Sequence, residues 1–357
     1  MRATCRDLDL TLRRTFRISR SAVDVAENVL LAIEHQGLTG LGEAHPYDFR
    51  GEDRCRILRA LEFFARWLEG QASLVEAFAD VRADGPPDAW PRAVANLLDC
   101  LPPEVRTSRG AMAALDVALH DLAGQRLGQP LWRLFGADPA KAPLTSFTIG
   151  IAPVPEMQEK VREAEPYAIL KIKVGTPNDL AILDGIRAVT DKPLRVDANA
   201  AWTVPEAIDK IRALQPYGIE FIEQPIPPGD IAGLRELRRA VSLPILADES
   251  VTTADDIRAL EGAVDGINVK LMKCGGLAEA RRMIALAHAL GMTVMLGCFI
   301  ESSVAITAAA HLAPLVEYAD LDGHLLISND PYTGVALDAA GRLLLPDRPG
   351  LGLLPRA

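Results

Sequence analysis

Eight short apolar segments recur at a nearly constant interval from Leu144 onward. The seven intervals between their starting points average about 25 residues, and most of them contain stretches with helical spacing. An apolar strand followed by a helix, repeated eight times at this period, predicts an α/β fold of the TIM-like (β/α)8 barrel type. A doubly wound open sheet is the alternative, but no GxGxxG motif follows any segment. The segments begin near Leu144, Ala168, Leu194, Ile219, Ile245, Ile267, Thr293 and Tyr318.

The chain before the barrel has two other patterns. Residues 3–12, 27–37 and 38–46 alternate between apolar and polar side chains, as antiparallel strands do. Residues 14–27 are polar and without clear periodicity, which predicts a loop. From about residue 53 to 128 the apolar spacing is helical.

These patterns divide the 357 residues into three parts. We expect an α+β capping domain over residues 1–125 and the barrel, which would hold the site, over residues 126–327. Residues 328–357 have the pattern of loop and hairpin, and we expect them to return to the capping domain.

The composition excludes several classes of protein. The chain is 49% hydrophobic and 24% charged, which is typical of a globular protein with a sizeable core. A net charge of −10 argues against a nucleic-acid surface, and no window of about eighteen apolar residues is present to span a membrane. The charged N-terminus does not resemble a signal peptide, and five cysteines without a CxxC pair indicate reduced thiols. We therefore expect a cytoplasmic protein.

Charged residues lie toward the C-terminal ends of the apolar segments, where (β/α)8 barrels keep their active sites. A buried parallel strand is otherwise almost entirely apolar. Each of these residues alone is also typical of a solvated rim or of a helix cap, but together they occupy equivalent places in successive repeats. The set consists of Lys171, Lys173, Asp197, Asn199, Glu223, Asp248, Glu249, Lys270, Asp320 and Asp322.

Three of these acids belong to neighbouring strands of the ring. Asp197, Glu223 and Asp248 end strands three, four and five, so their carboxylates can converge on one point. Three carboxylates without histidine or cysteine form a hard, all-oxygen site that suits Mg²⁺ or Mn²⁺ better than zinc. Without a cation they would repel one another.

The remaining charged residues surround this point. Strands two and six are diametrically opposite in a ring of eight, so Lys173 and Lys270 would face each other across the metal. Strand eight is opposite strand four, which places Asp320 and Asp322 across the mouth of the barrel. A substrate with a carboxylate at the metal and an ammonium at those aspartates would be held between the two lysines. The site suits a zwitterion with a removable proton.

The motifs KIK, DAN, EQP, DES and NVKLMKCGG, in this order, resemble those of the enolase superfamily, in its muconate-lactonizing-enzyme-like branch. GLGEA, ALDVALHDLAGQRLGQPLWRLFG and PDRPGLGL extend the resemblance over nearly the whole chain. Within the branch, FRISR at 16–20, GCFIESS at 297–303 and Asp-Leu-Asp at 320–322 resemble the dipeptide epimerases of the L-Ala-D/L-Glu epimerase type.

The resemblance implies a modified (β/α)7β barrel covered by the capping domain, and it assigns roles to individual residues. Asp197, Glu223 and Asp248 would bind one Mg²⁺ per subunit, for which Mn²⁺ can substitute. Lys173 and Lys270 would be the two acid/base groups. The substrate would be contacted by Thr148, Lys171, Cys298, Ile300, Asp320 and Asp322.

The activity implied by the resemblance is that of a Mg²⁺-dependent dipeptide epimerase, which is an isomerase. It would invert the Cα of the C-terminal residue of L,L-dipeptides by 1,1-proton transfer between two lysines, through an enediolate that Lys171 helps to stabilise. The resemblance also implies a homo-oligomer and a small-molecule dipeptide as the binding partner. We expect no binding to nucleic acid or to a membrane.

Other activities are open. N-acylamino-acid racemase, o-succinylbenzoate synthase and muconate cycloisomerase belong to the same superfamily, but their substrates lack the free ammonium that would explain Asp320 and Asp322. A non-catalytic binding barrel is the alternative from another class. Loss of Lys173 or Lys270 would favour it, and both are present.

The chain departs from the dipeptide epimerases in the loop after the first strand. Enzymes that act on L-Ala-L-Glu carry an arginine there for the side-chain carboxylate. Here Arg17 and Arg20 occur, but a gapless alignment matches no arginine. Asp24 or Asp48 would instead favour a cationic substrate.

Overall fold

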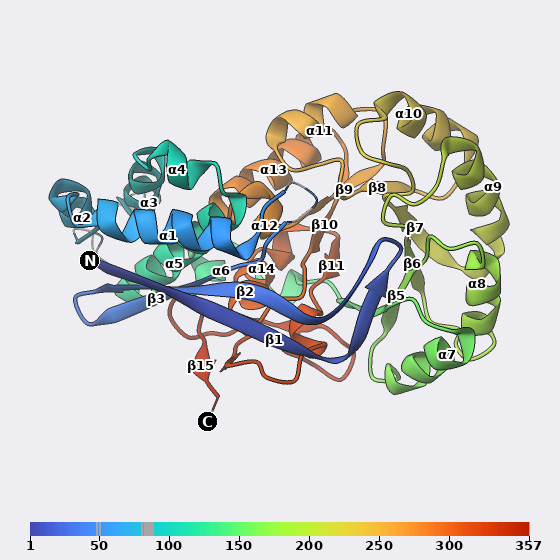
Figure 1. Cartoon of the computed structure of the whole chain (residues 1–357), viewed down its shortest axis with the longest axis horizontal. Helices are drawn as coiled ribbons and strands as arrows, with labels where there is room; N and C mark the ends of the chain where they lie inside the picture. Colours follow the sequence, from blue (N-terminus) through green and yellow to red (C-terminus); the bar gives the residue numbers. More distant parts are fainter. Residues whose placement is uncertain (48, 50, 80, 82–88, 357) are drawn as a thin grey trace.

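The computed structural model describes residues 1–357 except 48, 50, 80, 82–88 and 357. An antiparallel sheet and its helices, drawn in blue and teal, lie beside a barrel of eight parallel strands (Figure 1). In the part of the chain that the structure describes, no helix is both long enough and apolar enough to cross a membrane.

The barrel strands follow one another in chain order around the ring, and a parallel bridge between Thr145 and Ala319 joins the last strand to the first. An α-helix follows each strand except the last, which is followed by a short 3-10 helix over Gly323–Leu325. The predicted TIM-like fold is therefore confirmed. The strands are β4 (Ser146–Ile149), β5 (Ile169–Lys173), β6 (Leu194–Asp197), β7 (Ile219–Glu223), β8 (Ile245–Ala247), β9 (Gly266–Val269), β10 (Thr293–Gly297) and β11 (Tyr318–Asp320).

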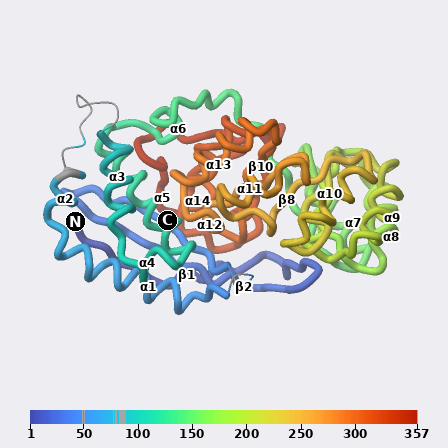
Figure 2. Tube along the Cα trace, turned by 90° about the horizontal axis from the view of Figure 1, so that it is seen from above, coloured from blue at the N-terminus to red at the C-terminus, as the bar shows by residue number. Residues whose placement is uncertain are grey.

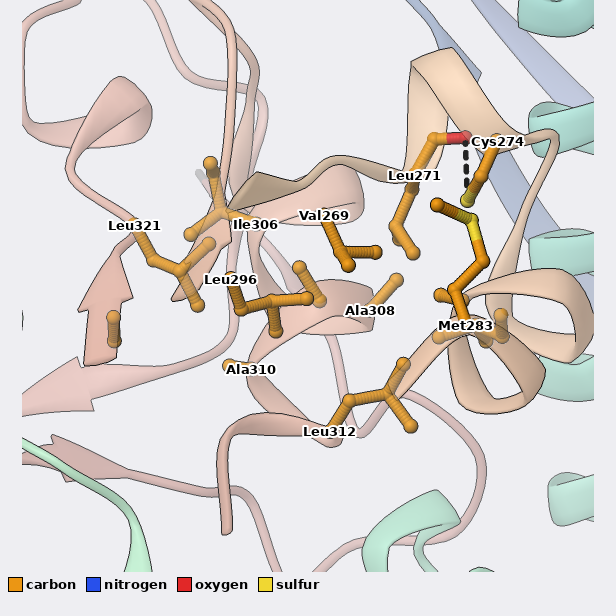
Figure 3. Close-up of a cluster of buried hydrophobic side chains, with 14 of the residues drawn as sticks. Val269, Leu271, Cys274, Met283, Leu296, Ile306, Ala308, Ala310, Leu312 and Leu321 are labelled. Carbon is orange, nitrogen blue, oxygen red and sulfur yellow. Dashed lines mark hydrogen bonds between the residues drawn. The ribbon is translucent and has the colours of Figure 1, made fainter. Parts of the chain in front are cut away.

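The barrel helices form an outer layer, and the apolar residues that face them are buried. Val269 on β9 and Leu296 on β10 belong to one buried cluster with Met283, Ile306 and Ala308 from the helices (Figure 3). Burying a side chain of this size stabilises the fold by about 1.5–3 kcal/mol. The helices are α7 (Val154–Glu163), α8 (Asp179–Arg187), α9 (Val204–Leu214), α10 (Ile231–Ala240), α11 (Ala254–Leu260), α12 (Leu271–Cys274), α13 (Leu277–Ala289) and α14 (Ser303–Ala310).

The inside of the barrel holds mainly aromatic and aliphatic side chains at one end and charged side chains at the other. Phe221, Leu246 and Met295 are fully or almost fully buried and pack together, with Tyr318 against them. The Arg195 guanidinium lies over the rings of Phe221 and Tyr318. These side chains close the floor of the barrel, so the charged residues farther along the same strands stand at its open, C-terminal end.

The capping sheet is dominated by a long hairpin, and here the sequence prediction was wrong. Residues 14–27, predicted as a loop, continue both strands of the hairpin up to a turn at Ser19 and Arg20. A register shift between Thr11 and Phe16 interrupts the alternation by which a strand is recognised. The hairpin reaches across to the barrel in both views (Figures 1 and 2). The strands are β1 (Arg2–Ile18), β2 (Ser21–His35) and β3 (Leu38–Ala44).

Glycines allow strand β3 to lie directly on the buried helix α5. A Cβ at Gly40 would overlap the Ala118 carbonyl oxygen, and one at Gly42 would overlap that of Ala114. The close packing at Gly40 and Gly42 therefore brings Glu43, the next residue of the GLGEA motif, against the barrel. The capping helices are α1 (Arg54–Leu68), α2 (Ala72–Ala79), α3 (Ala89–Asp99), α4 (Pro103–Arg106), α5 (Arg109–Leu127) and α6 (Leu131–Leu134).

The C-terminal segment contacts the capping region. The Ser328 amide donates to the Thr11 carbonyl at 2.9 Å, and the Leu351 amide donates to the buried Asp121 carboxylate at 2.8 Å. Its return agrees with the expectation from the sequence, while the boundaries at 125/126 and 327/328 stay predictions. The segment contains β12 (Tyr332–Thr333), β13 (Ala336–Leu337), β14 (Leu343–Leu344) and β15 (Leu354–Pro355).

Candidate active site

Three carboxylates converge at the open end of the barrel. Asp197 ends β6, Glu223 ends β7 and Asp248 directly follows β8, and each is at most 3% exposed. One oxygen from each lies within 4.8 Å of the other two. Burial and the neighbouring Asp197 carboxylate raise the pKa of Glu223 to about 8. A buried set of three carboxylate oxygens fits a hard divalent cation.

The loops that follow these acids have an uncommon backbone. Asn199, Ala200 and Gln224 have positive φ angles of 46°, 64° and 35°. Such angles are unfavourable for residues with a side chain and persist where the surroundings hold them. The Gln224 side chain accepts from the Asp248 amide at 2.9 Å, so it ties the loop after β7 to the acid after β8. The EQP motif thus positions a neighbouring carboxylate as well as its own.

Two lysines approach the acidic triad from opposite sides of the ring. Lys173 Nζ on β5 lies 2.6 Å from Asp197 Oδ2, and Lys270 Nζ, at the end of β9, lies 2.9 Å from Asp248 Oδ2. Strands β5 and β9 are four positions apart among eight. Burial lowers the pKa of Lys270, but the ion pair with Asp248 outweighs it and raises that pKa above its ordinary value.

Lys171 lies between the triad and the last strand. Its Nζ is 2.6 Å from Asp320 Oδ2, 2.7 Å from Glu223 Oε2 and 3.3 Å from Asp197 Oδ2. Burial alone would lower the pKa of Lys171, but these carboxylates hold it well above the ordinary value. Lys171 therefore remains a cation beside the acids.

The two aspartates of the Asp-Leu-Asp motif have different surroundings. Asp320 is held by Lys171 and by the Ser146 hydroxyl, which donates at 2.7 Å. Asp322 accepts from the Thr148 amide at 2.6 Å through Oδ2, whereas its Oδ1 lies 3.9 Å from Cys298 Sγ. Burial and the neighbouring Asp320 raise the pKa of Asp322 to about 6. Among the residues that the structure describes, a lysine is ion-paired with Asp320 but none with Asp322.

A cavity of about 530 Å³ lies between the capping region and the barrel, within the size range of small-molecule sites. It is lined by nine of the eleven residues proposed from the sequence, whereas Asp197 and Glu223, the other two, are fully buried and do not line it. The nine are Thr148, Lys171, Lys173, Asp248, Lys270, Cys298, Ile300, Asp320 and Asp322.

Sequence reasoning missed several side chains that hold these residues. Lys273 is buried and bonds to the side chain and the carbonyl of Asp248. Asn268 donates to Glu223 Oε1 at 2.7 Å. Asn268 on β9 stands two residues before Lys270, which directly follows that strand, so the period of two along a strand could have found it.

The capping region closes one side of the cavity. Arg20, at the hairpin turn, donates to Glu249 Oε1 at 2.8 Å and to the Asn199 carbonyl at 3.1 Å. The Asp24 carboxylate, which the sequence suggested for a cationic substrate, accepts from Thr15 at 2.6 Å and is not among the residues that line the cavity. Asp48 lies outside the described residues.

A histidine that sequence reasoning also missed faces the cavity. His45 Nδ1 lies 2.7 Å from Asn28 Oδ1, and the Asn28 amide donates to Glu43 at 2.6 Å and to the Ile300 carbonyl at 3.0 Å. Since the Asn28 amide faces two acceptors, its oxygen accepts from His45 Nδ1–H. Burial and the neighbouring Lys270 lower the pKa of His45 to about 3, which keeps the ring neutral.

Comparison with known proteins identifies the group. Residues 155–356 match the family described as enolase C-terminal domain-like, and residues 88–136 match the N-terminal domain of the mandelate racemase / muconate lactonizing enzyme family. The L-Ala-D/L-Glu epimerase of Bacteroides thetaiotaomicron is 39% identical over 356 residues, which cover 99% of this chain and 88% of that protein.

Solved structures that resemble this chain belong to the same group of enzymes. A dipeptide epimerase from Enterococcus faecalis, complexed with Mg and L-Leu-L-Tyr, is similar with a TM-score of 0.87 and 35% identity, covering 99% of this chain and 98% of that one. A dipeptide epimerase from Methylococcus capsulatus, complexed with Mg and L-Arg-D-Lys, has a TM-score of 0.85 at 35% identity and the same coverage. The chain therefore belongs to the mandelate racemase / muconate lactonizing enzyme family of the enolase superfamily, among its dipeptide epimerases, and is an isomerase.

Proposed function

We propose that this chain is a Mg²⁺-dependent epimerase that inverts the Cα of the C-terminal residue of L,L-dipeptides. The observation that carries the proposal is the placement of Lys173 and Lys270, which come from strands four apart in the ring and are ion-paired with different acids of the triad. Two acid/base groups on opposite sides of one cavity suit a reaction that removes a proton from one face of a carbon and returns one to the other.

The lysines carry the proton steps. The neutral amine of one lysine takes the α-proton, and the ammonium of the other donates a proton to the opposite face of the same carbon. Each turnover leaves the number of protons unchanged and exchanges the protonation states of the two lysines. Lys171, held as a cation, lies where it can offset the negative charge that develops on the substrate carboxylate.

The acidic triad would hold the cation, through Asp197, Glu223 and Asp248. When bound there, Mg²⁺ would supply positive charge that offsets the negative charge developing on the substrate and favours removal of the α-proton. Relatives of similar fold are complexed with Mg, which supports this choice of cation. Replacement of Mg²⁺ by Mn²⁺, a homo-oligomeric state and a cytoplasmic location stay predictions from the sequence.

A dipeptide supplies the two charges that this arrangement needs. Its carboxylate would lie at the triad and Lys171, and its α-ammonium at Asp322, which is paired with no lysine of the described part of the chain. N-acylated amino acids, o-succinylbenzoate precursors and muconate lack that ammonium and would leave Asp322 buried without a counter-charge. The curated relatives named as dipeptide or L-Ala-D/L-amino acid epimerases support the same substrate class.

The direct test is α-proton exchange. The protein and Mg²⁺ are incubated in D₂O with a pooled library of L,L-dipeptides, and products are read by mass spectrometry. We expect a gain of one mass unit in a subset of dipeptides, together with formation of the L,D isomers. A protein shown to bind Mg²⁺ that exchanges no dipeptide would contradict the proposed function, and N-acylated amino acids would then be tested.

The Asp322→Asn variant is expected to raise KM for dipeptides by about tenfold or more, because the substrate ammonium loses its anionic partner and keeps at most a neutral acceptor. The N-acetylated form of the same dipeptide is the matched control, because it has no ammonium and its binding should not be weakened by the substitution. Asp320→Asn should lower kcat as well, since Asp320 also holds Lys171. An unchanged preference between free and N-acetylated dipeptides in Asp322→Asn would remove the ammonium role.

A further inference from the structure

The cavity wall that the capping region contributes is mostly apolar. Of the described residues, six large apolar side chains are more than a third exposed, and three of them line this cavity: Val23 (37%), Val25 (43%) and Phe49 (40%). Apolar surface gathered at one place is typical of a surface that a ligand covers. Their concentration at the mouth of the site indicates that the substrate places apolar groups against them.

The alternation of the hairpin directs these side chains. Phe16 on β1 pairs with Val23 on β2, and both line the cavity. Ile18, two residues after Phe16 on β1, lines it as well. The pair between them, Arg17 and Ala22, points to the other face and does not line the cavity. The face of the hairpin that meets the substrate is therefore the apolar one.

Among the described lining residues, every lysine and arginine is already ion-paired within the protein. Arg20 binds Glu249 at 2.8 Å, and its guanidinium lies 5.1 Å from the centre of the Phe49 ring. The lysines are paired with the acids of the site. A carboxylate on the substrate's side chain would therefore lose its water without gaining an unpaired cation.

A cationic side chain on the substrate would also find no unpaired counter-charge among the described residues at this wall. Glu249, the lining acid beside the hairpin turn, is already paired with Arg20 at 2.8 Å, and Glu27 is the acid that the described part of the capping region contributes to the cavity wall. Its side chain is 70% exposed and lies 3.8 Å from Arg54, so it is solvated and faces a cation already. An exposed ion pair at such a rim contributes little to binding.

The hairpin turn stands above the end of the site where the substrate carboxylate would lie. The Ser19 hydroxyl and Arg20 both donate to the carbonyl of Asn199, two residues after Asp197. Ile18, beside this turn, is therefore near the residue that carries the carboxylate. The ammonium end, at Asp322, lies on the other side of the barrel mouth.

From these contacts we infer that the residue whose Cα is inverted carries an uncharged, apolar side chain, as leucine, methionine or phenylalanine does. This inference rests on the proposed function and narrows its substrate class. Relatives at 35% identity are complexed with dipeptides of both apolar and cationic side chains, so overall similarity does not decide between them.

The test is a panel that varies this one side chain. L-Ala-L-Leu, L-Ala-L-Met, L-Ala-L-Phe, L-Ala-L-Glu and L-Ala-L-Lys are incubated with the protein and Mg²⁺ in D₂O, and kcat/KM is taken from the loss of the C-terminal α-proton signal by NMR. We expect the apolar members to exceed both charged members by about tenfold or more.

A pair of adjacent substitutions tests the wall itself. Val23→Glu places a carboxylate on the cavity face of the hairpin, and we expect the ratio of kcat/KM for L-Ala-L-Leu to that for L-Ala-L-Lys to fall by about tenfold or more. Ala22→Glu adds the same charge on the opposite face and should leave the ratio unchanged. Val23→Gln, which adds a polar group without charge, should give an intermediate ratio.

The outcomes separate the two proposals. Exchange that favours L-Ala-L-Glu or L-Ala-L-Lys would overturn this inference and leave the proposed function standing. Exchange with none of the five, nor with a wider dipeptide library, would overturn both. Equal ratios in Val23→Glu and Ala22→Glu, with thermal melts showing both proteins folded, would remove the hairpin from side-chain recognition.

Discussion

Replacing Lys270 with methionine is expected to reduce the inversion of dipeptides by about 10³-fold, within the range that a positioned acid/base group contributes. Methionine keeps much of the length of the side chain but carries no proton. Asp248 keeps Lys273 as an ion-pair partner, so the cation site should remain formed. The measurement is the rate of L,D product formation by chiral chromatography.

The same variant should still exchange one α-proton without inversion. Lys173 remains, and it can remove and return a proton on its own face of the carbon. In D₂O, Lys270→Met should therefore exchange only one of the L,L and L,D isomers, and Lys173→Met should exchange only the other. This complementary pattern distinguishes loss of one base from general damage to the site.

Two results would contradict the assignment. Inversion at the normal rate in Lys270→Met would refute the two-lysine mechanism, and exchange of the same isomer by both variants would show that the lysines do not face opposite sides. Lys141→Met, which changes an exposed lysine in the 3-10 helix over Pro139–Lys141, is the control and should behave as the unchanged protein.

The Glu223→Gln variant is expected to lose both activity and stabilisation by Mg²⁺. Glutamine retains the shape and can keep a contact with Asn268, but it removes one of three anionic ligands. In the unchanged protein, Mg²⁺ at one hundred times its Kd should add about 2.7 kcal/mol to the free energy of unfolding. The measurement is the shift in Tm on adding Mg²⁺ after treatment with EDTA.

Glu220→Gln is the matched control for this experiment. Glu220 lies three residues earlier on the same strand, binds Arg195 at 2.8 Å and is 32% exposed. Its loss can lower Tm, because Arg195 is buried, but the increase in Tm on adding Mg²⁺ should persist. An equal Mg²⁺ shift in Glu223→Gln would place the cation elsewhere than at the triad.

Much of the barrel was predictable because its pattern is local. The apolar segments predicted near Leu194, Ile219, Ile245 and Thr293 begin where the structure begins its strands. The hairpin was not predictable in the same way, since the register shift after Thr11 offsets its alternation. A period of two can be followed only while the pairing is regular.

The same distinction applies to the candidate site, where the residues at the strand ends were predictable and the residues that support them were not. Asp197, Glu223 and Asp248 could be grouped from the sequence because neighbouring strands of a parallel barrel end at the same rim. Their supporting residues were missed, and Lys273 is the clearest case. It lies on α12 after β9 and reaches Asp248 only because the chain turns back toward the previous strand end.

Repeats, strand ends and motif spacing are properties of neighbouring residues, so the sequence alone determined the barrel, its acidic triad and the two lysines. The tertiary structure decided that Lys171 joins the triad to Asp320, and that Arg20 is held by Glu249, 229 positions away. Such contacts arise where the capping hairpin and the barrel pack together. Their partners are set by the distance and burial of side chains in space, which no local period along the chain records.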